Sequence, residues 1–433
     1  MNSLKKQAIN GVQWTTISAI AITLISIIKI SILTRYIGKA DFGLFAIATF
    51  IINFTGLFID LGISSAIIHK QNITKDEYSS LYWLNILFSI IIYLLILSIT
   101  PFVSSFYKLK ELTFLIPIVT STLIISAIGR QSRVVLQKNL HFKKISIFDI
   151  VANTAGLIVS VYLAYLNYGV YALVYSAIVT AIVSSALYLF DGLNSNRISF
   201  RFKFNETKPF LKIGLYQTGG QIINFFNRDI DILIIGKLYS PEILGSYNLA
   251  KQLVFRPMQI INPVINSVTA PLLAKVQNEP NRLKSIYLKI VSLVSTANFS
   301  IYLLIALFAK LIVIILYGNQ YVGITTLVQI LSVYVFVRSL LNPVGSLLIA
   351  TGKTKLDFNW NLLILFLVPL SVFLGTLISV NAVAISLSVL AVLLIVPSWY
   401  FLIRKLININ LIEYIFSTLP RYKQSLLILS KKE

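Results

Sequence analysis

The chain has 433 residues, of which 57% are hydrophobic and only 12% are charged, and its formal net charge is +22. Soluble proteins usually carry ~25% charged residues, so this composition excludes a water-soluble globule and predicts an integral membrane protein. The sequence contains no cysteine, which excludes disulfides, thiol chemistry and cysteine metal sites. The two histidines, His69 and His141, lie in basic loops, so we expect no metal site.

Apolar runs of about twenty residues, long enough to cross a bilayer as helices, recur along the whole chain. The amino terminus leads into the first run without a small-residue cleavage pattern, so we interpret it as a transmembrane helix and not as a removed signal. The pattern predicts an all-α integral membrane fold of twelve transmembrane helices: Val12–Leu33, Phe42–Ile67, Leu81–Val103, Leu112–Ile128, Ile147–Leu166, Val170–Phe190, Ile213–Ile235, Leu244–Pro271, Ile290–Leu316, Thr325–Ala350, Phe358–Ile378 and Val383–Ile403.

Loops rich in lysine and arginine alternate along the chain with loops that contain few of them. With the amino terminus in the cytoplasm, most of them fall in cytoplasmic loops and tails, as the positive-inside rule requires. We therefore expect both termini in the cytoplasm. The positive charge then serves topology and contact with anionic membrane lipid, and it does not indicate nucleic acid.

An internal repeat divides the chain. The segment TRYIGKADFGLF at 34–45 has its counterpart in GKLYSPEILGSY at 236–247, because a basic residue, a short turn, an acidic residue, a glycine and an aromatic recur in the same order. The repeat predicts two pseudo-symmetric six-helix bundles, residues 1–200 and 201–433, with a central cavity as the substrate path.

Several motifs resemble one known family. They are LTRYIGKADFGLFAIA at 33–48, DLGISSAIIHK at 60–70 and DIDILIIGKLYSPEILGSYNLAKQL at 229–253. They are similar to polysaccharide flippases, the Wzx-type O-antigen and capsule repeat-unit translocases, in the superfamily of MATE exporters and lipid II flippases.

The resemblance implies a MATE-like fold, alternating access, and a substrate of oligosaccharide carried on undecaprenyl pyrophosphate. It places the protein in O-antigen, capsule or exopolysaccharide synthesis, as a monomeric transporter that could work beside a polysaccharide polymerase.

Ionisable residues inside the apolar helices are the candidate site residues, because charge at that depth is costly and persists where it faces a cavity or a partner. We interpret five cations as ligands of the pyrophosphate: Arg256, Arg338, Arg228, Lys251 and Lys29. Arginine suits phosphate because its planar donors bind two oxygens at once. The alternative, clearest for Lys29, is a side chain that extends to the headgroups.

Three carboxylates are candidates for coupling to a proton or sodium gradient: Asp231, Asp229 and Asp60. The alternative for Asp231 is a structural pair with Arg228, three residues away on the same helix face. Three polar side chains on helix seven could contact sugar hydroxyls, although such residues also join helices together: Asn224, Gln217 and Gln221.

Two rival functions remain open. A MATE-like exporter of small cations should have carboxylates dominating its cavity, whereas the cations here at least equal them. A membrane-integral polysaccharide polymerase would need sizeable external loops with acid and base residues, and the predicted external loops are very short. We therefore predict a transporter without a cofactor, and not an enzyme.

Overall fold

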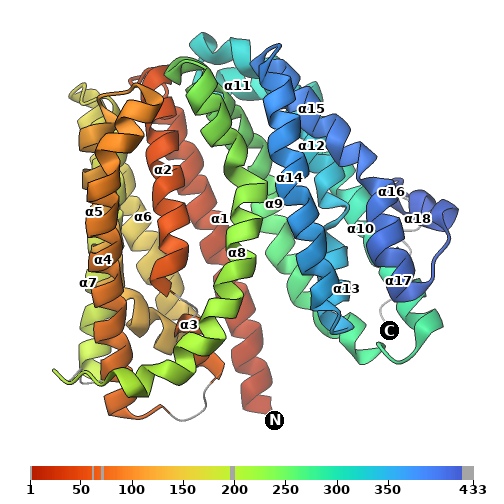
Figure 1. Ribbon diagram of the computed structural model, residues 1–433, viewed down its shortest axis with the longest axis horizontal. Coiled ribbons are helices and arrows are strands. Elements are labelled where there is room, and N and C mark those ends of the chain that lie inside the picture. Colours follow the sequence, from red (N-terminus) through yellow and green to blue (C-terminus); the bar gives the residue numbers. More distant parts are fainter. Residues whose placement is uncertain (1, 61–62, 70–72, 196–199, 422–433) are drawn as a thin grey trace. The chain divides into compact units, whose positions relative to one another are not determined.

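The computed structural model describes residues 2–60, 63–69, 73–195 and 200–421, and every long element within these ranges is a helix (Figure 1). By length and composition, ten of the described helices could cross a membrane. These candidate spans are Asn10–Leu33, Lys39–Asp60, Lys75–Tyr107, Leu112–Lys138, Phe142–Tyr165, Val170–Leu193, Pro280–Leu307, Asn319–Ala350, Lys355–Thr376 and Val380–Ile407. The chain is therefore an all-α, multi-pass membrane protein.

Two long helices do not appear among these ten spans. They are α8 (Phe204–Leu238) and α9 (Pro241–Lys275), and both are the length of a membrane-crossing helix. These helices carry Arg228, Asp229, Asp231, Lys251 and Arg256, which lower their apolar character. The predicted seventh and eighth spans thus correspond to the helices α8 and α9, which are less apolar than the other ten.

The chain forms two compact units, Met1–Gly245 and Ser246–Glu433. Within the first unit, α7 packs against both α5 and α6, α1 packs against α6, and α4 packs against α5. The helices of this unit, besides α8 and the start of α9, are α1 (Asn2–Leu33), α2 (Lys39–Asp60), α3 (Ile63–His69), α4 (Lys75–Tyr107), α5 (Leu112–Lys138), α6 (Phe142–Tyr165) and α7 (Val170–Ser195).

The division between the units falls later than the predicted boundary between residues 200 and 201. Helix α8 contacts α2, α3 and α4, so it packs with the first unit although the repeat assigns it to the second half of the chain. The repeat describes topology, whereas packing decides which helices form a compact unit.

The second unit is built around α10 (Pro280–Leu307), which contacts α12, α13, α17 and α18. Its buried core includes Tyr287, Leu347, Ile403 and Tyr414. The other elements are α11 (Ala309–Tyr317), the 3₁₀ segment η1 (Asn319–Ile324), α12 (Thr325–Ser339), α13 (Asn342–Ala350), α14 (Thr354–Thr376), α15 (Val380–Leu393), α16 (Ile395–Ser398), the π segment η2 (Trp399–Ile403), α17 (Arg404–Ile407) and α18 (Leu411–Thr418).

Several helix bounds differ from the predicted ones. The predicted fourth helix ends at Ile128, but α5 continues to Lys138. The predicted tenth helix is interrupted, since α12 ends at Ser339 and α13 begins at Asn342 with a proline in its first turn. Hydropathy marks only the apolar part of a helix, while backbone hydrogen bonds continue through the polar residues that follow.

The two repeated turns meet through their glycines. A Cβ atom on Gly43 would lie 2.0 Å from the carbonyl oxygen of Pro241, and one on Gly245 would lie 1.9 Å from the carbonyl oxygen of Lys39. The contact is reciprocal, because the repeat aligns Lys39 with Pro241 and Gly43 with Gly245. Only a residue without a side chain permits this approach of two backbones.

Candidate functional site

The first unit contains a pocket of about 460 Å³ that combines charged and polar side chains. A pocket of this size could hold a sugar or a phosphate group. Five helices line it: α2, α3, α5, α7 and α8. Its polar lining residues are Asp60, Ser64, Ser126, Arg130, Arg133, Gln137, Ser184, Ser185, Tyr188 and Gln221.

Asp60 and Arg130 form an ion pair at the wall of this pocket. Asp60 is the last residue of α2, and its Oδ1 atom lies 3.7 Å from the NH1 nitrogen of Arg130 on α5. Ser64 of α3 donates a hydrogen bond to the same carboxylate oxygen. Both charged side chains remain more than a quarter exposed, at 28% and 29%, so water and a ligand can reach the pair.

Arg133 lies three residues along α5, on the same face as Arg130. Its NH2 nitrogen donates to Asp149 Oδ2 of α6 at 3.0 Å, and its Nε donates to the hydroxyl of Tyr188 at 3.3 Å. That hydroxyl donates in turn to Asp149 Oδ1 at 2.8 Å. The network joins α5, α6 and α7, and it fixes the direction in which the Arg133 guanidinium points.

Close packing of α5 on α7 brings these groups together. A Cβ atom on Gly129 would lie 2.7 Å from the Cα of Ser185, so a larger residue would force the two helices apart. Sequence reasoning assigned Arg130 and Arg133 to a cytoplasmic loop, and it did not single out Asp149 or Tyr188. The missed signal was the i, i+3 spacing of the two arginines directly after an apolar helix with no turn between them.

Of the predicted site residues, the structure places Asp60 and Gln221 at this pocket. Lys29 lies elsewhere in the first unit. Its Nζ donates to the hydroxyl of Ser176 on α7 at 3.2 Å, and that hydroxyl donates to the carbonyl of Gly156. Lys29 therefore joins α1 to α7, which shows a packing contact for this cation.

The charged residues of α8 have different surroundings. Arg228 contacts the carboxylate of its neighbour Asp229, with Nε and NH2 each 2.8 Å from Oδ2, and its side chain is half exposed. Asp231 is buried at 4% exposure and accepts the backbone N–H of Ile232. Asn224 is exposed. The side chain of Gln217, another predicted sugar contact, lies outside the described residues.

Two predicted cations of the second unit meet at one aromatic ring. Lys251 of α9 and Arg338 of α12 lie 5.7 and 5.8 Å from the ring centroid of Phe255, within the range of a cation–π interaction. Arg338 also donates to the hydroxyl of Tyr334 at 2.7 Å. We call these four residues the cation–aromatic cluster, and it places two positive charges, one on α9 and one on α12, beside the same ring.

Arg256, the fifth predicted cation, is half-buried on α9 in the same unit. It lies near the hydroxyl of Tyr317, which donates to the backbone carbonyl of Leu249. The predicted cations thus lie in both units. Arg130 and Arg133, which the sequence analysis did not select, are two further cations that line a pocket. Guanidinium groups that face a pocket can bind phosphate oxygens in pairs, and serine, glutamine and tyrosine beside them can bind hydroxyl groups.

Two curated relatives align with most of the chain. The teichuronic acid biosynthesis protein TuaB of Bacillus subtilis is 29% identical over 98% of this chain and 87% of its own length. The amylovoran biosynthesis protein AmsL of Erwinia amylovora is 31% identical over 81% of this chain and 91% of its own.

Solved structures show the same fold. The lipid II flippase MurJ in an inward closed conformation aligns with a TM-score of 0.69 at 14% identity, covering 97% of this chain and 91% of that one. An inward-facing MATE family multidrug resistance transporter of the MOP superfamily aligns with a TM-score of 0.65 at 16% identity, covering 96% and 99%. The fold is therefore shared by a flippase and by exporters, and it does not separate those two functions.

The family model described as polysaccharide biosynthesis protein matches residues 32–326, which is more than half of the chain. This match includes the repeated turn at 34–45, all of the pocket residues and the α8–α9 region. The chain belongs to the polysaccharide biosynthesis protein family.

Proposed function

We propose that this protein flips undecaprenyl-pyrophosphate-linked oligosaccharide repeat units from the inner to the outer leaflet of the bacterial plasma membrane. The observation that carries the proposal is the pair of guanidinium groups, Arg130 and Arg133, at a pocket of about 460 Å³ in a polysaccharide biosynthesis protein. Flipping moves a molecule without making or breaking covalent bonds, so the protein acts as a transporter and not as an enzyme.

The pocket chemistry suits the polar part of such a substrate. The Asp60–Arg130 distance of 3.7 Å is longer than a charge-assisted hydrogen bond of about 2.7–2.9 Å. A pyrophosphate oxygen could approach Arg130 more closely than Asp60 does, and so compete with that carboxylate. Gln137 and Gln221 on the pocket wall would then contact sugar hydroxyls.

The finer topology belongs to the same proposal. It comprises twelve spans with α8 and α9 included, six in each half, both termini in the cytoplasm, and alternating access by a monomer. Its support is the repeat, the distribution of lysine and arginine, and the MATE-like fold. We further propose that the buried Asp231 couples the cycle to a proton or sodium gradient, and that a polysaccharide polymerase acts beside the protein.

The alternative is an exporter of small molecules, because the same fold occurs in a MATE family multidrug resistance transporter. Such an exporter of cations would need carboxylates that exceed the cations in its binding pocket. In this pocket, Arg130 and Arg133 line the wall together with Asp60, and Asp149 is held by Arg133 and Tyr188. Two guanidinium groups and one carboxylate therefore line the pocket wall, which is not the excess of carboxylates that an exporter of cations would need.

Sealed proteoliposomes loaded with a labelled undecaprenyl-pyrophosphate oligosaccharide test the proposal. An impermeant external reagent should reach all of the label when the wild-type protein is present, and only the outer-leaflet half when it is absent. With the double variant Arg130→Gln/Arg133→Gln, the reagent should reach only the outer-leaflet half of the label, as in protein-free liposomes. Arg282→Gln, which removes an exposed arginine of the second unit, is the control and should flip like the wild type.

Two results would count against the proposal. If the wild type gives access to only half of the label with several glycans, the exporter is the better description. If the double variant flips at the wild-type rate, the pocket is not the phosphate site, even though the protein is a flippase.

A further inference from the structure

The last described helix lies against the second unit with an apolar face outward. Helix α18 buries Tyr414 and Ser417 against α10, while Ile412 and Phe416 are 61% and 53% exposed. A short helix that exposes large apolar side chains in a membrane protein is suited to the boundary between headgroups and acyl chains.

Several specific contacts hold α18 and the residues after it on α10. Lys284 Nζ lies 2.6 Å from Glu413 Oε2, the backbone N–H of Arg421 donates to the Thr296 hydroxyl at 2.9 Å, and Ser295 donates to the carbonyl of Thr418. These contacts are made near both ends of α18. The helix therefore has a defined position on α10, and a cavity between the two helices is a feature of the fold.

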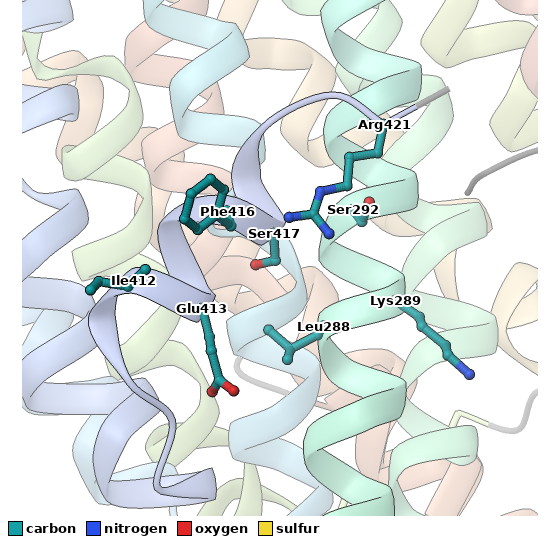
Figure 2. A pocket seen from close by; sticks show the side chains of 8 residues that line it. All are labelled: Leu288, Lys289, Ser292, Ile412, Glu413, Phe416, Ser417 and Arg421. Atoms are coloured by element: carbon teal, nitrogen blue, oxygen red, sulfur yellow. The ribbon is translucent and has the colours of Figure 1, made fainter. Parts of the chain in front are cut away.

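A pocket of about 340 Å³ lies between α10 and α18 (Figure 2). Lys289 and Arg421 supply positive charge at its wall, and Leu288 and Phe416 supply apolar surface. Figure 2 shows the Arg421 guanidinium extending from the segment after α18 toward Ser292. Glu413 also lines the pocket, but its carboxylate is paired with Lys284.

Ser292 provides an independent indication of a ligand. The residue is only 6% exposed, it lines the pocket, and in the described part of the chain its Oγ has no hydrogen-bond partner. Buried hydroxyl groups in proteins are usually hydrogen-bonded, so an unpartnered one at the wall of a pocket that also contains an arginine is a donor available to a ligand. The Ser417 hydroxyl is different, because it donates to the Tyr414 carbonyl at 2.6 Å.

The chemistry of the wall defines the ligand. An arginine with a hydroxyl donor binds phosphate oxygens, and a nearby lysine adds charge attraction. A free phosphate would gain nothing from the exposed side chains of Ile412 and Phe416, whereas an amphiphile would cover them. We propose that the α10–α18 pocket binds the phosphate headgroup of an anionic phospholipid, with Arg421 and Ser292 on the phosphate and the acyl chains along α18.

The test uses the full chain purified in detergent and three probes: phosphatidylglycerol, phosphatidylcholine and glycerol 3-phosphate. Binding is measured by native mass spectrometry and by the shift in the thermal unfolding midpoint. Phosphatidylglycerol should bind to the wild type and raise its unfolding midpoint. Phosphatidylcholine and glycerol 3-phosphate should bind with at least tenfold lower affinity and raise the midpoint less.

Two variants and one control locate the site. Arg421→Gln and Ser292→Ala should each lower the affinity for phosphatidylglycerol about tenfold. Arg404→Gln removes an exposed arginine that likewise lies over aromatic rings, 5.5 Å from that of Trp399, and should bind like the wild type. Without lipid, Ser292→Ala should unfold at the wild-type temperature or above it, because the hydroxyl it removes has no partner within the described chain.

Three outcomes would overturn the proposal. Equal losses in Arg421→Gln and Arg404→Gln would show a general charge effect. Binding of phosphatidylcholine as tight as that of phosphatidylglycerol would show an apolar contact only, and equally tight glycerol 3-phosphate would show a site for free phosphate. None of these outcomes bears on flipping, which the liposome assay measures separately.

Discussion

Replacing Gly245 with alanine should damage the contact between the two repeated turns. The new Cβ would lie 1.9 Å from the Lys39 carbonyl oxygen and would also meet the backbone nitrogen of Gly43 at 2.9 Å. The backbones must separate by roughly 1.5 Å to reach an ordinary contact distance of about 3.4 Å. Because both obstacles are backbone atoms, no side-chain rotation relieves the clash.

Overpacking of this kind costs about 1–3 kcal/mol, and we expect the upper end for Gly245→Ala. A loss of about 3 kcal/mol changes the unfolding equilibrium about 100-fold. Thermal unfolding of the purified protein in detergent would show this as a lower midpoint. Gly43→Ala should show a similar loss, because its Cβ would lie 2.0 Å from the Pro241 carbonyl oxygen. The double variant should lose less than the sum, since either change alone opens the same contact.

Gly220→Ala is the matched control. Gly220 lies inside α8, and a Cβ there would meet nothing within 4 Å. Alanine in a helix interior is favoured over glycine by about 1 kcal/mol, so this variant should be as stable as the wild type or more stable. If Gly245→Ala and Gly220→Ala unfold at the same temperature, the reciprocal glycine contact does not exist as described.

Three further predictions concern charged residues. Asp149→Asn should lower the thermal midpoint, because it weakens the ion pair with Arg133; full retention of the wild-type midpoint would contradict the network described above. A hydrogen bond from Lys284 lowers the pKa of Glu413, so this pair stabilises the α18 contact above the usual carboxyl pKa and is lost as the pH falls through the lowered value. The protection of the α18 amides against hydrogen exchange, relative to their intrinsic exchange rate at the same pH, should therefore decrease in acid, and in Glu413→Gln it should be lower already at neutral pH. Asp231→Asn should change the dependence of flipping on the pH or sodium gradient, and an unchanged dependence would leave Asp231 a structural residue.

Much of the fold could be predicted from composition and periodicity. Apolar runs of membrane length are visible without tertiary information, because a helix must satisfy its own backbone hydrogen bonds in lipid. The ends of the helices were harder to predict. In α5 the apolar run ends near Ile128, while the helix continues to Lys138. Because of this difference, the prediction assigned Arg130 and Arg133 to a loop, whereas in the structure they lie on α5 and line a pocket.

The candidate site was only partly predictable for the same reason. A charge in an apolar run is conspicuous, which is why Asp60, Lys251 and Arg338 could be singled out. Arg133 and Asp149, by contrast, lie on different helices, and no local pattern joins them. Their pairing depends on how closely α5, α6 and α7 pack.

The sequence by itself determined that this is a multi-pass helical membrane protein with an internal repeat and the motifs of a polysaccharide flippase. These properties depend on local composition and on order along the chain. The tertiary structure alone decided that Gly43 and Gly245 meet, that Arg130 faces Asp60, and that α18 covers a pocket on α10. Such contacts join residues far apart in the chain, and they form only when whole helices pack at distances that their smallest side chains permit.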